Sequence, residues 1–593
     1  MTGPHNLKIK INNQGVALYQ QRKYPQALKL YRQALKIDPA YSEAHFNLAV
    51  LYLVTTKYPK AITHFSQALK LNPHYAEAQT GLLQALVHQT KSYQQQGNYL
   101  KALATINRAI SLSPSRPHLL YNQGIIYEQL GQLNQAITAY TQVINLDPHF
   151  YPAYPQLYMA KRKAFDWSKM GKLIHTLDHY HANTPFVSLI RTENLQKNLD
   201  AAVTCSLIYN QNAKLKYPPS SINHHSSTIK LGYFSKDFHD HPIGQLVAPL
   251  FKYHDRSRFE IYAFSYGDND QSLYRRQIKG TVDHFIDIAA LDNYQTVQLM
   301  INKHIDILID LTGNTAQNRY IVLAGRPAPV QISWLGLLGT SGTNFIDYQM
   351  VDPIVVPLPH AQHYTEKLVH LPHVLPLYPP NKGKPLSRRQ FDLPQNSFVF
   401  ACFNQTYKIT PELFSVWMHI LKAISNSILW LWDREEDASH NLQQATRTAG
   451  IDPKRLIFFS RLPLNDHLIR AQCADLALDT TIYSGGATTA QTLSAGIPTL
   501  TLLGNHYASR LTASLLTQAG VPELITHSLT EYQSQAITLA KYPQKVLAIK
   551  SKIQNLKSNI PQFVTHLEST YKITWDRYRR GLPPTHLTIT PQS

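Results

Sequence analysis

Five short segments rich in polar residues and glycine each follow an apolar stretch that is predicted to form a β-strand. They span residues 237–242, 310–315, 336–342, 403–408 and 483–489. In an open parallel sheet, ligands bind beyond the carboxyl ends of the strands. The sequence therefore predicts that the chemistry of this chain lies in these five segments.

The fifth segment has the composition of a phosphate-binding turn. Gly485 and Gly486 would let the backbone approach a phosphate, and the N–H groups of a helix start, together with the hydroxyls of Thr488 and Thr489, bind anions. Lys408, in the fourth segment, would add a positive charge beside a leaving diphosphate. The alternatives are a simple helix cap and a surface lysine. The glycines of 336–342 match neither GxGxxG nor GxxxxGK[ST], which disfavours dinucleotide dehydrogenases and P-loop NTPases.

His241, at the end of the first segment, is a candidate general base, because the pKa of histidine lies near neutral pH. The alternative is a structural role, since the chain has 28 histidines. His239, Asp240 and His241 could also act as metal ligands. No further cluster of ligand residues accompanies them, so the sequence predicts a site without metal.

The N-terminal part repeats itself with a period of 34 residues, which is typical of tetratricopeptide arrays. Matching pairs are Ala27 and Ala61, Tyr31 and Phe65, and Pro39 and Pro73, and a third copy is displaced by 41 residues. The extra residues lengthen either a helix or a loop. Asparagine recurs at one repeat position (Asn13, Asn47 and Asn122), where it would bind the backbone of an extended acceptor peptide. A purely structural asparagine is the alternative.

The pattern beyond the repeats predicts an α superhelix followed by an α/β fold with two doubly wound lobes. We expect a repeat solenoid over 1–150, a helical connector and linker over 151–227, and a first lobe over 228–390. A second lobe follows over 391–580, and a loose tail over 581–593. The polar, turn-rich stretch 217–227 is the expected boundary before the first lobe.

Composition narrows the partners and the compartment. The net charge is +20, from 57 basic and 37 acidic residues. The charge is scattered, with no arginine-rich run, which favours a solvated basic surface over nucleic-acid binding. A basic groove that binds acidic peptides is the intermediate interpretation. Cys205, Cys402 and Cys473 are far apart, which fits a reducing compartment. No apolar run reaches membrane-spanning length and no signal-peptide core is present, so a cytoplasmic location is expected, with export by an unusual route left open.

Several stretches together resemble the protein O-linked N-acetylglucosamine transferases and the related SPINDLY-type proteins. They are residues 232–242, 326–331, 334–342, 403–409, 466–475 and 508–510, and the resemblance spans nearly the whole chain. It implies a GT-B fold with two nucleotide-binding-like lobes. It also implies transfer of a sugar, usually from UDP-N-acetylglucosamine, to a Ser or Thr hydroxyl of a protein, with inversion and without a metal or other cofactor.

The resemblance also implies roles for individual residues. Gln405 and Lys408 match residues near the donor diphosphate, and His467 and Arg470 match residues near the nucleotide. Thr488 matches part of the phosphate-binding turn, and His241 matches a histidine on the acceptor side.

Two positions depart from the transferase pattern. Gly486 and Ala487 stand where the transferases have His-Thr, and Gln491 stands where an acidic residue holds the ribose hydroxyls. The glycine-rich turn is closer to the SPINDLY-like branch, which resembles a fucose-transferring enzyme, whereas 403–408 is closer to the N-acetylglucosamine branch. The donor sugar is therefore open.

Two classes of function follow. The first is a protein glycosyltransferase that recruits its acceptor through its own repeats. The second is a non-catalytic scaffold whose lobes have lost turnover, which the departures at Gly486 and Gln491 motivate. Hydrolysis of the donor by purified protein distinguishes the two.

Overall fold

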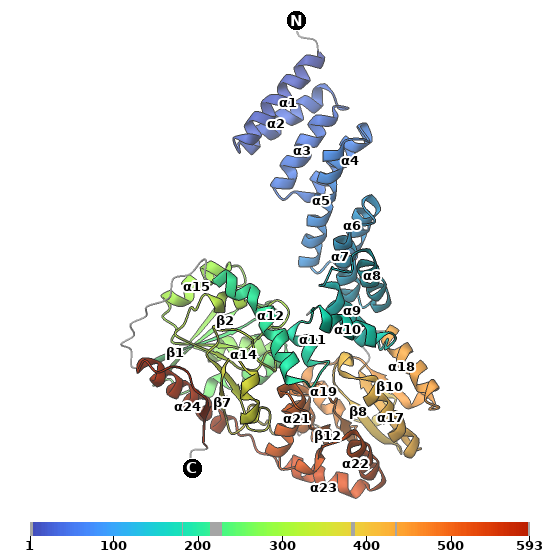
Figure 1. The fold of residues 1–593 in the computed structure, drawn as a ribbon, viewed down its shortest axis with the longest axis vertical. Coiled ribbons are helices and arrows are strands. Elements are labelled where there is room, and N and C mark those ends of the chain that lie inside the picture. The colour runs from blue at the N-terminus through green and yellow to red at the C-terminus, as the bar shows by residue number, and fades with distance from the viewer. Residues whose placement is uncertain are drawn as a thin grey trace. The chain divides into compact units, whose positions relative to one another are not determined.

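The structure of the chain is a computed structural model that describes residues 4–180, 182–213, 228–380, 383, 386–432 and 436–590. The expected linker at 217–227 lies outside these residues. The chain forms two compact units, Met1–Ala164 and Phe165–Ser593 (Figure 1).

The first unit consists of helices that pack in sequential pairs, α1 on α2, α3 on α4, α5 on α6 and α7 on α8. This confirms the predicted tetratricopeptide superhelix. The helices are α1 (Pro4–Gln20), α2 (Tyr24–Ile37), α3 (Ser42–Val54), α4 (Tyr58–Leu71), α5 (Ala76–Gln95), α6 (Tyr99–Leu112), α7 (Pro117–Gln129), α8 (Leu133–Leu146) and α9 (Ala153–Lys163).

In the pairs α1–α2 and α7–α8, a large repeat residue on one helix packs into the space that a glycine leaves on the other. The Tyr31 ring lies so close to Gly15 that a Cβ there would come within 2.6 Å of it, and Tyr140 and Gly124 repeat the arrangement at 2.5 Å. The inserted residues lengthen a helix, because α5 has 20 residues whereas α3 and α7 have 13 each. The unit also extends past the predicted boundary at residue 150, since α9 packs on α8.

The second unit begins with connector helices, α10 (Met170–His179), α11 (Pro185–Leu189) and α12 (Leu195–Ala213). The connector is joined to both lobes. Ser206 Oγ donates to the carbonyl of Gly342 in the first lobe at 2.6 Å. Glu193 accepts hydrogen bonds from Asn505 N at 2.6 Å and Ser509 Oγ at 3.0 Å in the second lobe.

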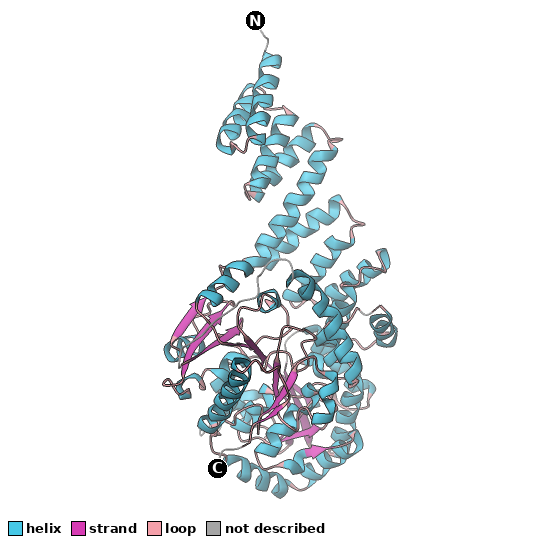
Figure 2. Cartoon of the chain, turned by 60° about the vertical axis from the view of Figure 1, so that its left-hand side comes forward, coloured by secondary structure: helices cyan, strands magenta, loops and turns pink. Residues whose placement is uncertain are grey.

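The first lobe is built on an eight-stranded parallel sheet in the order β14-β7-β6-β5-β4-β1-β2-β3. Figure 2 draws the strands in magenta and the helices that surround them in cyan. Its elements are β1 (Ile229–Ser235), α13 (Pro242–Val247), β2 (Phe259–Ser265), α14 (Leu273–Thr281), β3 (His284–Asp287), α15 (Asn293–Asn302), β4 (Ile307–Asp310), α16 (Tyr320–Ala324), β5 (Val330–Ser333), β6 (Tyr348–Val351), β7 (Lys367–His370) and β14 (Leu587–Thr588).

The second lobe has a six-stranded parallel sheet in the order β10-β9-β8-β11-β12-β13. The two sheets confirm the predicted pair of doubly wound lobes. Its elements are β8 (Phe398–Cys402), α17 (Pro411–Ala423), β9 (Ser427–Trp432), α18 (Glu436–Thr448), β10 (Leu456–Phe459), α19 (Leu464–Ala471), β11 (Leu476–Leu478), α20 (Ala487–Ser494), β12 (Thr499–Leu502), α21 (Tyr507–Gln518), β13 (Ile525–Thr526), α22 (Leu529–Lys541) and α23 (Pro543–Gln554).

The expected loose tail over 581–593 is wrong for its described part. Residues 587–588 form β14, which pairs with the edge strand β7, and Ile589 is buried and donates its N–H to His370. Burial of Ile589 and the unpaired edge of β7 explain why these residues are ordered onto the sheet.

The last long helix, α24 (Ile560–Arg579), returns to the first lobe, although it was predicted as part of the second. A buried chain of hydrogen bonds holds it there. Glu568 accepts from His254 Nδ1 at 3.0 Å and from Asp255 N at 2.8 Å. Tyr233 Oη lies 2.9 Å from His254 Nε2 and 3.0 Å from Tyr571 Oη. Burial lowers the pKa of His254 against the opposing effect of Glu568, so a neutral imidazole donates to Glu568 and accepts from Tyr233.

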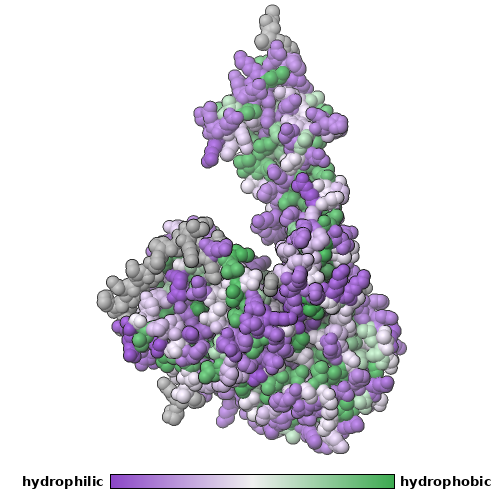
Figure 3. Space-filling view, in the orientation of Figure 1, coloured by the Kyte–Doolittle hydropathy of each residue, from purple (hydrophilic) through white to green (hydrophobic). Residues whose placement is uncertain are grey.

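The surface of the two units is mainly hydrophilic on the face shown in Figure 3, with apolar patches between. Among the described residues, no helix is both long and apolar enough to cross a membrane.

We predict that Glu568→Ala destabilises the second unit by about 2–4 kcal/mol, because it leaves the buried imidazole N–H of His254 and the backbone N–H of Asp255 without an acceptor. Urea unfolding followed by tryptophan fluorescence measures this unit alone, since every tryptophan of the chain lies in it: Trp167, Trp334, Trp417, Trp430, Trp432 and Trp575.

The matched control is Glu523→Ala, which removes an exposed ion pair to Lys552. Such pairs contribute about 0–1 kcal/mol. Equal losses in the two variants would contradict the importance of the buried chain.

Candidate functional site

The structure brings the fourth and fifth polar segments together at the carboxyl edge of the second sheet. Lys408, after β8, reaches the segment after β11: its Nζ donates to the carbonyl of Ser484 at 2.9 Å and lies 4.5 Å from the centre of the Tyr483 ring. The lysine predicted to meet the diphosphate therefore lies next to the predicted phosphate turn.

Lys408 is a buried cation with unusual electrostatics. Burial lowers the pKa of its ammonium to about 8, against the opposing effect of the Asp479 carboxylate. Asp479 accepts hydrogen bonds from Asn404 Nδ2 at 2.8 Å and Thr501 Oγ1 at 2.7 Å. The sequence analysis missed Asp479. Its position directly after an apolar strand, like that of Asp310, was the available signal.

The phosphate turn leads into α20. Gly486 has a φ of +48°, and a Cβ there would lie 2.9 Å from Leu511, so the turn favours glycine. Thr488 is half-buried, whereas Thr489 is buried and its hydroxyl lies 2.8 Å from that of Thr512. The prediction of Thr489 as a direct ligand is therefore not supported; its hydroxyl braces the turn from inside. Gln405 is half-buried and immediately precedes the short helix that carries Lys408.

Two further predicted residues, His467 and Arg470, face each other on α19. Arg470 donates from Nη2 to His467 Nδ1 at 2.9 Å and from Nη1 to the Ser460 carbonyl at 2.7 Å. Burial, and then Arg470, lower the pKa of His467 to about 4, so the ring is neutral with its proton on Nε2. His467 also packs edge-on against Phe403 at 5.1 Å, which places α19 beside the Lys408 segment.

His241 caps α13 at the carboxyl edge of the first sheet. Its Nδ1 accepts from Ile243 N at 3.3 Å and lies 3.7 Å from Asp237 Oδ1. Burial lowers its pKa against the effect of Asp237, which leaves a neutral ring. Because Nδ1 accepts an amide, Nε2 carries the proton. In this conformation the Nε2–H of His241 is available as a donor, and Nδ1 can act as a base only after it releases Ile243.

A contact between the two lobes joins these features. Gln491, on α20, donates from Nε2 to Oε1 of Gln245, on α13, at 3.1 Å. The helix that His241 caps therefore faces the helix that follows the phosphate turn. Gln245 is a residue that the sequence analysis missed, and no sequence signal marks it, because its partner is 246 residues away.

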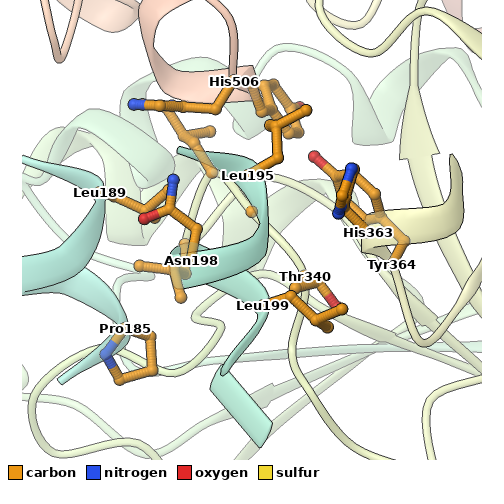
Figure 4. A pocket seen from close by; sticks show the side chains of 13 residues that line it. Pro185, Leu189, Leu195, Asn198, Leu199, Thr340, His363, Tyr364 and His506 are labelled. Atoms are coloured by element: carbon orange, nitrogen blue, oxygen red, sulfur yellow. The ribbon is translucent and has the colours of Figure 1, made fainter. Parts of the chain in front are cut away.

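The third segment, 336–342, takes a different position. It lines a pocket with the connector and the start of α21 (Figure 4). A Cβ at Gly342 would come within 2.2 Å of the Ala202 backbone, so this glycine permits close packing on α12. The pocket is lined by Pro185, Leu189, Leu195, Asn198, Leu199, Leu337, Leu338, Gly339, Thr340, His363, Tyr364, His506 and Tyr507.

The three repeat asparagines lie on the first helices of their pairs. Asn13 on α1 is exposed, and Asn47 on α3 and Asn122 on α7 are half-buried. Asn47 Nδ2 donates to Asn12 Oδ1 at 3.1 Å, so one of the three binds within the array. Their peptide-binding role stays a prediction.

No group of three or more His, Cys, Asp or Glu residues suited to holding a metal occurs in the part of the chain that the structure describes. Around His239 and His241, the contacts between histidine rings and carboxylates are longer than hydrogen bonds. His239 Nδ1, for example, lies 3.7 Å from Asp270 Oδ2. Whether the reaction needs a metal stays a prediction.

Two known proteins have sequences similar to more than half of this chain. The chain is 33% identical over 378 residues to a probable UDP-N-acetylglucosamine–peptide N-acetylglucosaminyltransferase, SEC, of Arabidopsis thaliana, a match that covers 61% of this chain and 38% of that protein. A UDP-N-acetylglucosamine–peptide N-acetylglucosaminyltransferase of Caenorhabditis elegans is 26% identical over 480 residues, a match that covers 61% of this chain and 42% of that protein. The chain thus matches only about 40% of the length of these relatives.

A solved structure has the same fold. A variant of the Thermobaculum terrenum O-GlcNAc transferase superposes with a TM-score of 0.66 and 24% identity, covering 98% of this chain and all of that one. Residues 12–76 and 90–162 match the tetratricopeptide repeat family. Residues 197–377 and 380–570, together more than half of the chain, match Glycosyl transferase family 41. With its repeats, its two parallel sheets and this match across both lobes, the chain belongs to glycosyl transferase family 41.

Proposed function

We propose that this chain is an inverting protein O-glycosyltransferase that moves N-acetylglucosamine from UDP-N-acetylglucosamine to Ser or Thr of a protein. The observation that carries the proposal is the placement of Lys408, a buried cation, against the Ser484 carbonyl at the start of the phosphate turn. The names of the family relatives support the donor and the class of acceptor.

The chemistry follows from charge. When the sugar–phosphate bond breaks, negative charge develops on the diphosphate, and preorganised positive groups lower the barrier. The Lys408 ammonium and the first N–H groups of α20 supply that charge without a metal. The neutral His467 offers an Nε2–H donor to the nucleotide. Gln405 lies in the same segment as Lys408, directly before its short helix. His241, on the facing helix, binds on the acceptor side.

The acceptor is proposed to reach the lobes through the repeats. The exposed Asn13 and the half-buried Asn122 provide amide groups for an extended backbone. The net charge of +20 favours acidic peptides over other acceptors. A cytoplasmic location fits this role, because acceptors and nucleotide sugars are found there.

Two alternatives keep a specific observation each. The glycine at position 486, with its positive φ, fits a glycine-rich turn of the kind in the SPINDLY-like branch, so a fucosyl or other hexosyl donor is the second candidate. The neutral Gln491, which stands where the transferases have an acidic residue, keeps a non-catalytic scaffold as a further candidate. The placement of Lys408 against the phosphate turn favours turnover.

We predict that Lys408→Ala lowers sugar transfer about a hundredfold or more, which corresponds to about 3 kcal/mol of lost transition-state stabilisation. Purified protein, radiolabelled UDP-N-acetylglucosamine and a protein acceptor provide the assay, and GDP-fucose is the parallel donor. The control is Lys422→Ala, an exposed lysine of the same lobe. Unchanged turnover in Lys408→Ala would refute the assignment, and no donor hydrolysis by wild type would favour the scaffold.

The pKa of Lys408 predicts how donor binding depends on pH. The free site holds an ammonium with a pKa of about 8, and a bound diphosphate raises that pKa. Its contribution to affinity is therefore complete below pH 8 and is lost as pH rises from there through the pKa of the complex. Calorimetry with UDP from pH 7 to 9.5 should show affinity falling above pH 8. The decline should be absent in Lys408→Ala; an equal decline there would assign it to another group.

We predict that transfer survives an excess of EDTA, because Lys408 and the start of α20 meet the phosphate charge. The assay compares initial rates with and without chelator, and again after adding Mg²⁺ or Mn²⁺. Loss of activity with EDTA and recovery with either metal would overturn the metal-independent mechanism.

A further inference from the structure

We infer that Asp240 and Gln245 of the first lobe fix the orientation of the Gln491 amide, so that Gln491 presents its carbonyl oxygen to the ribose hydroxyls of the donor nucleotide. The inference rests on the proposed function, because its ligand is the nucleotide of the donor. We call Asp240, Gln245 and Gln491 the amide relay.

Two hydrogen bonds connect the relay across the lobes. Gln245 donates from Nε2 to Asp240 Oδ1 at 2.9 Å. Gln491 donates from Nε2 to Gln245 Oε1 at 3.1 Å. Asp240 precedes α13 and Gln245 lies on it, whereas Gln491 lies on α20 in the other lobe.

The carboxylate at one end determines the direction of both amides. A carboxylate offers acceptors only, so Gln245 must turn its NH₂ toward Asp240. Oε1 of Gln245 then faces Gln491, which must turn its own NH₂ toward Gln245. Oε1 of Gln491 consequently points away from Gln245, and no hydrogen bond to it is present among the described residues. Without the charged end, the two amides would have two orientations of similar energy.

Orientation matters at this position because an amide has one acceptor where a carboxylate has two. Gln491 lies on α20, the helix that follows the phosphate turn beside Lys408. A glutamine that presented its NH₂ there could not accept a hydroxyl proton. The relay supplies what the neutral side chain lacks, so Asp240 and Gln245 act as positioning residues for nucleotide binding.

The Asp240 carboxylate also has a neighbour in the second lobe. Arg461 Nη2 lies 3.9 Å from Asp240 Oδ2, and its side chain is 72% exposed. Such an exposed pair contributes little. Arg461 therefore provides a control that changes the charge around Asp240 without breaking the relay.

The test compares UDP with 2′,3′-dideoxy-UDP by isothermal titration calorimetry on the full chain. If wild type binds GDP instead, GDP and its dideoxy analogue replace them. We expect wild type to prefer the ribose form about tenfold, the effect of two neutral hydrogen bonds. Asp240→Asn keeps the shape but gives Gln245 both orientations, so the preference should fall to about threefold. Affinity for the dideoxy form should not change.

Three control variants isolate the relay. Arg461→Ala should keep the wild-type preference. Gln491→Ala should remove the preference, and adding Asp240→Asn to it should change nothing further, because the aspartate acts through Gln491. Circular dichroism of each variant verifies the fold.

The possible outcomes distinguish failure of the amide relay from failure of the proposed function. Asp240→Asn that keeps the wild-type preference, or that weakens both ligands equally, overturns the relay. Wild type that binds both nucleotides equally also overturns it, while the proposed function stands. Wild type that binds neither UDP nor GDP overturns the proposed function together with the relay.

Discussion

A buried carboxylate at the carboxyl edge of the second sheet organises the candidate site. Asp479 is removed from water, and burial raises its pKa. An isolated buried charge is costly, so its oxygens must be hydrogen-bonded. Asn404 from the end of β8 and Thr501 from β12 satisfy them, and Tyr532 of α22 donates to the backbone carbonyl of Asp479. These contacts fix the strand ends from which Lys408 and the phosphate turn extend.

The charge of Asp479 also favours the protonated form of Lys408. Burial alone would favour a neutral amine, and the carboxylate opposes that effect, so the pKa of Lys408 settles at about 8. The lysine is thereby poised between two states near physiological pH. Its ammonium is held by a backbone carbonyl and an aromatic ring, neither of which neutralises it. A diphosphate entering the site would therefore meet a cation that has no anionic hydrogen-bond partner among the described residues.

The lobes are held together through α21, the helix that also packs against the phosphate turn, since Ser484 donates to the Ala508 carbonyl. Arg510 Nε donates to the Ile354 carbonyl at 2.6 Å, and Ser514 Oγ donates to Asp352 Oδ2 at 2.5 Å. Glu193 of the connector accepts from Asn505 at the same place. The amide relay is a second, lighter contact between the lobes. The two lobes thus meet at a junction of several hydrogen bonds on α21 and at the amide relay, where Gln491 donates to Gln245.

The sequence by itself determined the parts that rest on local pattern. A period of 34 residues requires paired helices, and apolar runs between helix-length segments require strands, so the repeats and most strands were predictable. Strands β6 and β7 were not predicted, because charged residues limit their apolar runs: Asp347 and Asp352 flank β6, and β7 begins at Lys367. Phosphate-binding residue types after predicted strands singled out Lys408 and Gly486 as candidates, because a lysine ammonium and a glycine turn at a helix start both suit an anion.

Tertiary structure decided whatever depends on residues distant in the sequence. Only packing shows that Thr489 faces Thr512 and Thr488 does not, or that α24 crosses to the first lobe through Glu568 and His254. The direction of Gln491 depends on Asp240, which is in the other lobe. A hydrogen-bond partner leaves no mark on a single sequence when it is hundreds of residues away, so the chemistry of these side chains follows from the fold.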